Sequence, residues 1–237
     1  MKNLFLIFSL IVLGLGVFAS NYGVYNRENY KLKSDDSEKV LFILDFSNSM
    51  NEYIDNEPKC ELMIKTMKNL LRTIPPETSV GMRVYGHRNG ITAIDACKAS
   101  KCVNPICTHN SQNIAHTLDH LTPSGMTPIT YSLKQAIRYD FAGFNGKKHI
   151  ILLTDGGENC DESPCKFAME LIKTRRDVII DVIAFTIEDE EDLAQLECAS
   201  LVTSGKFYTA NTACELANSL AKSLNSRKKV EAVIIPH

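Results

Sequence analysis

The stretch that decides the fold is KVLFILD, residues 39–45, an apolar run that ends on an aspartate. A strand that is apolar on both faces is typical of a parallel sheet whose two sides are covered. Comparable runs recur at residues 79–87, 148–155 and 177–187, with helical patterns between them. This alternation predicts a doubly wound, Rossmann-like α/β fold, with a mostly parallel central sheet and helices on both faces.

Helices are expected wherever apolar residues recur at helical spacing between these strands. The segments are residues 60–74, 113–121, 128–141, 163–176, 189–201 and 212–224. A further strand is expected at residues 205–210, and residues 230–236 are a candidate last strand. Residues 91–106 lack clear periodicity, and we interpret them as an edge strand plus a crosslinked loop.

The bulk composition fits a single globular domain. The chain has 237 residues, of which 44% are hydrophobic and 23% charged, and its formal net charge is -2. A charge of this sign provides no general attraction for nucleic acid. Neither GxGxxG nor GxxxxGK[ST] occurs, so the common phosphate-binding loops are absent from the sequence.

The first residues have the pattern of an export signal. Lys2 is followed by an apolar stretch, Leu4 to Phe18, and a small residue, Ala19, after which we expect cleavage. The alternative is a retained anchor, although the stretch is shorter than a comfortable membrane span. The expected organisation is a signal peptide at 1–19, a linker or exposed arm at 20–38, a domain at 39–226, and a tail or last strand at 227–237. Both interpretations place the domain outside the cytoplasm, in the periplasm, at the cell surface or secreted, and cleavage would leave no stable membrane span.

Eight cysteines in an exported chain favour disulfides over reactive thiols. Cys160 and Cys165 are close enough in sequence to crosslink one loop, and Cys198 and Cys214 are candidates to join two helices. The pairing of the other four is left open. They are Cys60, Cys97, Cys102 and Cys107.

Oxygen-bearing side chains gather where predicted strands end or helices begin. They are Asp45, Ser47 and Ser49 in DFSNS, Thr127 in PSGMTPI and Asp155 in TDGGEN. Each segment alone fits an ordinary turn or helix cap. In open α/β sheets, however, functional groups collect at the carboxyl ends of the strands, so these segments are expected to meet.

Taken in this order, the five residues resemble the metal-ion-dependent adhesion site of a von Willebrand factor A domain. The family signature is D-x-S-x-S, then a threonine from a middle loop, then an aspartate that ends a later strand. The resemblance covers about residues 39–224, and RVYGHR, GMTPI and TDGGENC, with Cys165 following, are similar to the exported bacterial branch of the family.

The resemblance implies a binding module without enzymatic activity. Ser47, Ser49 and Thr127 would offer hydroxyls to a divalent cation, while Asp45 and Asp155 would neutralise its charge, largely through bound water. The expected ion is Mg²⁺, with Mn²⁺ or Ca²⁺ as alternatives, since hard cations prefer oxygen ligands. One coordination position would accept a carboxylate from a protein partner in adhesion or envelope assembly.

Three other interpretations compete with this one. A metal-dependent phosphoester or ester hydrolase would use Asp45 and Asp155 with Glu158 as its base. A structural envelope component would depend on its disulfides, and its metal would be incidental. A zinc site would draw on residues near the HTLDH stretch, but that stretch lacks the glutamate of HExxH. Its candidate ligands are Cys102, Cys107, His109, His116 and His120.

Overall fold

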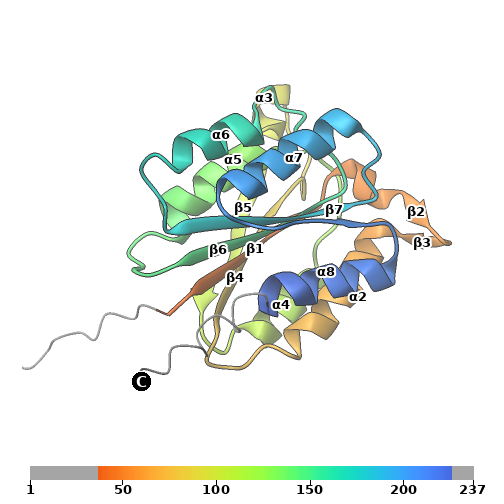
Figure 1. Cartoon of the computed structure of the whole chain (residues 1–237). Helices are drawn as coiled ribbons and strands as arrows, with labels where there is room; N and C mark the ends of the chain where they lie inside the picture. The colour runs from red at the N-terminus through yellow and green to blue at the C-terminus, as the bar shows by residue number, and fades with distance from the viewer. Residues whose placement is uncertain (1–36, 226–237) are drawn as a thin grey trace, which may run out of the picture. The chain divides into compact units, whose positions relative to one another are not determined.

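The computed structural model describes residues 37–225, which form a six-stranded sheet between two layers of helices (Figure 1). The strand order is β5-β4-β1-β6-β7-β8, and the pairing is parallel except between β4 and β5. The predicted α/β fold, doubly wound around a mostly parallel sheet, is therefore confirmed.

The sheet strands are β1 (Lys39–Asp45), β4 (Ser79–Tyr85), β5 (Ser100–Cys107), β6 (Lys148–Thr154), β7 (Val178–Phe185) and β8 (Phe207–Ala210). The α-helices are α2 (Lys59–Leu71), α3 (Ala93–Ala96), α4 (Ser111–Leu118), α5 (Ile129–Gln135), α6 (Pro164–Leu171), α7 (Glu190–Val202) and α8 (Ala213–Asn225). A 3-10 turn, η2 (Asn48–Asn51), follows β1, and a small hairpin, β2 (Tyr53–Ile54) and β3 (Glu57–Pro58), leads into α2. A π-helical turn, η3 (Ala136–Asp140), extends α5.

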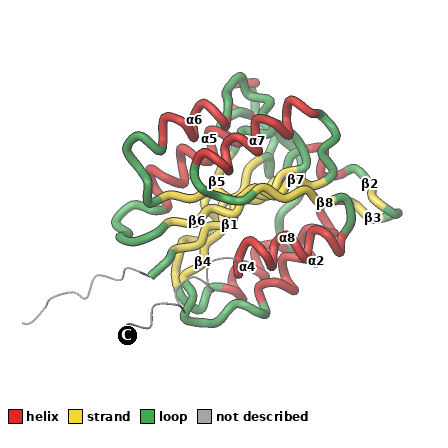
Figure 2. Tube along the Cα trace, viewed as in Figure 1, coloured by secondary structure: helices red, strands yellow, loops and turns green. Residues whose placement is uncertain are grey.

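Strand β1 lies at the centre because both of its faces are apolar. Phe42 and Leu44 belong to one core cluster, which packs under α2, α4 and α8. Leu41 and Ile43 belong to the other cluster, on the side of α5, α6 and α7. Figure 2 shows these two groups of helices on opposite sides of the yellow strands. Alternate residues of one strand thus build two cores.

Two predicted segments differ in detail from the structure. The segment at 91–106 contains the short helix α3 before the antiparallel edge strand β5. The helix expected over 163–176 ends at Leu171, and it is followed by turns in which the amides of Thr174 and Arg175 donate to the Leu171 carbonyl. The Arg175 guanidinium then binds Asp177 at 2.9 Å, which fixes the turn into β7. The signal peptide, nearly all of the linker and the candidate last strand lie outside the described residues.

The predicted cysteine pairs are wrong. Cys97 bonds Cys160, and Cys165 bonds Cys198, with Cα–Cα distances of 5.5 and 5.2 Å. Helices α6 and α7 lie side by side on one face of the sheet, which brings Cys165 and Cys198 together (Figure 1). Cys214 is exposed on α8, on the opposite face, and is out of reach of Cys198.

Candidate functional site

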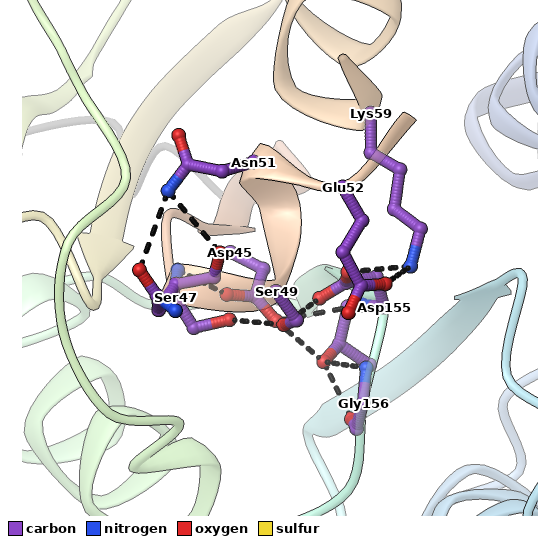
Figure 3. A network of polar contacts seen from close by, with 10 residues as sticks. Asp45, Ser47, Ser49, Asn51, Glu52, Lys59, Asp155 and Gly156 are labelled. Atoms are coloured by element: carbon purple, nitrogen blue, oxygen red, sulfur yellow. Dashed lines mark hydrogen bonds and ion pairs between the residues drawn. The ribbon is translucent and has the colours of Figure 1, made fainter. Parts of the chain in front are cut away.

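Four of the five predicted site residues meet where β1 and β6 end side by side. Asp45 closes β1, and Asp155 directly follows β6. The Ser49 hydroxyl donates to Asp155 Oδ1 at 2.7 Å and lies 3.0 Å from the Ser47 hydroxyl (Figure 3). Side chains from segments more than a hundred residues apart in sequence thus form one connected group of oxygens.

Asp45 is held by two backbone amides and one hydroxyl from the ends of β1 and β6. Its Oδ1 accepts from the Ser47 amide at 2.7 Å. Its Oδ2 accepts from the Thr154 hydroxyl at 2.8 Å and from the Asp155 amide at 3.4 Å. These three hydrogen bonds fix the orientation of the Asp45 carboxylate, and the residue is fully buried.

Burial gives the two carboxylates an unusual electrostatic environment. It raises the pKa of Asp45 to about 6, and the negative charge of Asp155 adds to the shift. Burial also raises the pKa of Asp155. Two acids that share a water-poor site repel each other, so a cation placed between them would relieve both the desolvation and the repulsion.

The loop before α5, which carries Gly125 and Thr127, is bound through its backbone to the serine loop that follows β1. Ser47 and Gly125 form a parallel bridge, and the Asn48 amide donates to the Gly125 carbonyl at 3.0 Å. The Gly125 amide in turn donates to the Gly86 carbonyl at 2.7 Å. Gly86 has a φ of +68°, and a Cβ there would lie 2.5 Å from the Ser47 amide nitrogen. Only glycine therefore lets the end of β4 approach the serine loop this closely.

Thr127, the fifth predicted residue, makes its side-chain hydrogen bond with Asn159 rather than with the other four. The Thr127 amide donates to Asn159 Oδ1 at 2.7 Å, and Asn159 Nδ2 donates to the Thr127 hydroxyl at 3.3 Å. Asn159 stands four residues beyond Asp155, so the loop that follows β6 positions the threonine. We call the five side chains of Asp45, Ser47, Ser49, Thr127 and Asp155 the candidate site.

Glu158 supports the same loop and is not free to act as a base. Its Oε2 accepts from the Thr130 amide at 2.7 Å, at the start of α5, and its Oε1 accepts from the Cys160 amide at 3.0 Å. Burial raises the pKa of the Glu158 carboxyl, and the two amides oppose that shift. The hydrolase hypothesis therefore lacks the uncommitted carboxylate on which it relied.

Sequence reasoning missed Lys59, which approaches the candidate site from α2. Its Nζ lies 3.1 Å from Asp155 Oδ2 and 2.7 Å from Glu52 Oε2 (Figure 3). A weak signal was available, because a lysine in the first turn of a helix opposes the helix dipole and needs a reason to be there. Asn159 was also missed, since an asparagine in a glycine-rich loop has an ordinary turn explanation.

Within the described residues, those of the zinc hypothesis do not come together as a metal site. The rings of His116 and His120 are 4.8 Å apart in a T-shaped contact on an exposed face. Cys102 lies instead on the edge strand β5. Across residues 37–225, no three or more His, Cys, Asp or Glu side chains are grouped to hold a metal. The candidate site differs in kind, because three of its five side chains carry hydroxyls.

The fold and the connected group of oxygens define an α/β domain with a polar site at the carboxyl ends of its parallel strands. The model of the von Willebrand factor type A domain matches residues 39–229, and the chain belongs to this family. Domains of the family bind protein partners, and those that have the adhesion site bind divalent cations. Within residues 37–225, every helix is too short or too polar to cross a bilayer.

Two proteins of Bacillus subtilis (strain 168) are related to the chain along most of their length. YwmC, an uncharacterised protein, is 29% identical over 209 residues, covering 86% of this chain and 91% of its own. YwmD, also uncharacterised, is 27% identical over 195 residues, covering 80% and 85%. These relatives bring no known activity.

Solved structures share the fold at low sequence identity. Proximal thread matrix protein 1 from the mussel byssus, in a form with a zinc-occupied MIDAS motif, has a TM-score of 0.60 at 22% identity, and the match covers 80% of this chain and 45% of that one. The pilus adhesin SpaC from Lactobacillus rhamnosus GG has a TM-score of 0.61 at 14% identity, covering 81% and 31%. The present chain thus corresponds to less than half of each of these proteins. By their names, one is a matrix protein and the other a pilus adhesin.

Proposed function

We propose that the chain is an exported binding module that holds a divalent cation at the candidate site and uses it to bind an acidic side chain of a protein partner. The observation that carries the proposal is the hydrogen-bonded group formed by Ser47, Ser49 and Asp155 above the buried Asp45. The expected ion is Mg²⁺, with Mn²⁺ or Ca²⁺ as alternatives.

The donor set suits a hard cation. Two carboxylates and three hydroxyls offer only oxygen, which Mg²⁺, Mn²⁺ and Ca²⁺ prefer over nitrogen or sulfur. The thiol of Cys60 stays protonated, because burial and then the charges of Asp45 and other nearby acids raise its pKa to about 12. When bound, the cation would supply a positive centre with a position for an outside carboxylate. The residues of the chain would align the oxygens and keep Asp45 away from water.

Export is supported by the disulfides. Bonds of this kind persist in oxidising compartments and are rare in the cytosol. Cys97–Cys160 and Cys165–Cys198 both lie in the described domain, and Cys160 directly follows Asn159 in the loop of the candidate site. The adhesion and matrix proteins among the structural neighbours have roles of the same type.

Calorimetric titration with MgCl₂ and MnCl₂ tests the cation part of the proposal. We expect Asp45→Ala and Thr127→Ala to weaken binding by about tenfold or more, since each removes an oxygen from the candidate site. Thr130→Ala is the matched control, because Thr130 is buried three residues further on and its hydroxyl makes no hydrogen bond to a member of the site. Equal affinity in all four proteins would contradict the proposal.

Capture of proteins from the extracellular fraction tests the partner part. A partner held through the cation is expected to bind immobilised wild-type protein and Thr130→Ala, and to be released by EDTA. Immobilised Thr127→Ala is expected to capture little of this partner. A partner that binds equally in EDTA would favour the structural envelope role instead.

A further inference from the structure

Lys59 reaches into the candidate site from the first turn of α2. Its side chain is only 9% exposed, and Nζ contacts Asp155 Oδ2 at 3.1 Å. The opposite oxygen of the same carboxylate, Oδ1, accepts from the Ser49 hydroxyl. Asp155 is therefore held from two sides, by a serine of the site and by an ammonium group (Figure 3).

The position of Lys59 is unfavourable by itself. A positive charge at the beginning of a helix opposes the helix dipole, and burying an ammonium group requires compensating negative charge. Glu52 provides part of this compensation at 2.7 Å, but its side chain is 66% exposed and its charge is screened by solvent. Asp155, whose side chain is fully buried in this ion pair, is the stronger partner.

The charges of the site make this contact relevant to ligand binding. Glu52 is left out of the count because solvent screens its exposed carboxylate. Among the buried groups, Asp45 and Asp155, when ionised, carry two negative charges, and the positive charge of Lys59 leaves a net charge of minus one. After a divalent cation binds, the group would carry an excess positive charge. An incoming carboxylate would remove that excess, so the full complex is the electrically balanced state.

We propose that Lys59 couples the two binding events, weakening the affinity for the cation alone and strengthening the binding of a carboxylate to the loaded site. This inference rests on the proposed function and adds a role for a residue outside the candidate site. Lys59 acts as a positioning and charge-setting residue, because it contacts Asp155 rather than the ligand. The coupling is reciprocal, so the carboxylate raises the affinity for the cation by the same factor.

Titration with Mn²⁺, in sodium acetate and in sodium chloride of equal ionic strength, tests the inference. In chloride, Lys59→Met is expected to bind Mn²⁺ about tenfold more tightly than wild type, because a nearby positive charge has been removed. Acetate is expected to raise the affinity of the wild type more than that of Lys59→Met. Lys59→Arg keeps the charge and is expected to behave as wild type in both buffers.

Lys65→Met is the matched control for this series. Lys65 lies on the same helix and pairs with Glu57, but its side chain is 64% exposed and away from Asp155. Its variant is expected to match wild type. Thermal unfolding in EDTA checks that each variant folds, and there Lys59→Met is expected to melt below wild type, since Asp155 loses its partner.

The outcomes separate this inference from the proposed function. If wild type binds Mn²⁺ and Thr127→Ala weakens it, but Lys59→Met binds no more tightly than wild type, the role of Lys59 is wrong and the cation site stands. An equal acetate effect in wild type and Lys59→Met also overturns the coupling. If every folded protein, wild type included, fails to bind Mn²⁺, both proposals fall.

Discussion

Asn159 holds Thr127 through two side-chain hydrogen bonds. Its carboxamide accepts from the Thr127 amide and donates to the Thr127 hydroxyl, at 2.7 and 3.3 Å. We expect Asn159→Ala to leave the fold intact and to weaken Mn²⁺ binding about fivefold, because a net contribution of about 1 kcal/mol is typical of such a hydrogen bond. Calorimetric titration measures the change.

Asn113→Ala is the control for this prediction. Asn113 lies on α4, in the other helix layer, where it donates to the Asn110 side chain. Its variant is expected to bind Mn²⁺ as wild type does. Wild-type affinity in Asn159→Ala would mean that Thr127 keeps its place without the carboxamide.

The residues of the site were predictable to different degrees. Asp45, Ser47 and Ser49 follow an apolar strand at a spacing that matches a known signature, so one short stretch indicates both an element and its chemistry. Their role in metal binding stays a prediction. Lys59 could not be placed, because its contact with Asp155 depends on how α2 packs against the end of β6. Contacts of this kind arise from tertiary structure and leave only a weak trace in sequence.

At the scale of elements, the two disulfides connect different kinds of segment, one joining two loops and the other two helices. Cys97–Cys160 joins the loop after α3 to the loop that carries Asp155 and Asn159. Cys165–Cys198 joins helices α6 and α7. They close segments with sequence separations of 63 and 33 residues. Chain-entropy estimates for such loops are about 4 kcal/mol each, so the two bonds are similar in stability and differ in location.

This difference leads to a paired prediction. Cys97→Ser/Cys160→Ser and Cys165→Ser/Cys198→Ser are each expected to lower the free energy of unfolding by about 2–4 kcal/mol. Only the first pair is expected also to weaken Mn²⁺ binding, because only that bond holds the loop of Asn159. Denaturant unfolding measures the change in stability, and calorimetric titration of the folded variants measures the change in Mn²⁺ affinity. Loss of affinity in both double variants to the same degree would show that general stability, rather than the loop, controls the site.

The elements themselves followed from periodicity, whereas their crosslinks did not. The apolar run of β1 and the helical spacing of α2 are local patterns, and both elements formed where expected. The cysteine pairs were wrong because nearness in sequence was taken as nearness in space. Cys165 on α6 bonds Cys198 on the neighbouring α7, whereas Cys214 lies on α8, on the opposite side of the sheet (Figure 1). Which helices share a face is decided by strand order, which no single segment encodes.

For the molecule as a whole, the parallel direction of the strands places several loops, and the charged residues that they carry, at the same edge of the sheet. Because β1, β4, β6 and β7 are parallel, the loops that follow them lie at one edge of the sheet. The chain after β7 is acidic, and Glu190, Glu191 and Asp192 form the first turn of α7. Asp192 Oδ2 accepts from the Gly157 amide at 3.1 Å, so this turn touches the loop of Asp155. A protein with a formal net charge of only -2 thereby has an acidic surface, formed by the first turn of α7, beside the loop that follows Asp155.

This surface is expected to attract cations over a distance and to depend on salt. Glu190→Gln/Glu191→Gln should weaken Mn²⁺ binding about twofold at about 20 mM salt and have no measurable effect at about 0.5 M, where the Debye length is a few ångströms. Glu77→Gln/Glu170→Gln removes the same charge near the opposite edge, before β4 and late in α6, and should change little at either salt concentration. A decrease of equal size in both double variants would mean that net charge alone matters. A decrease that persists at high salt would instead place the α7 carboxylates in direct contact with the ion.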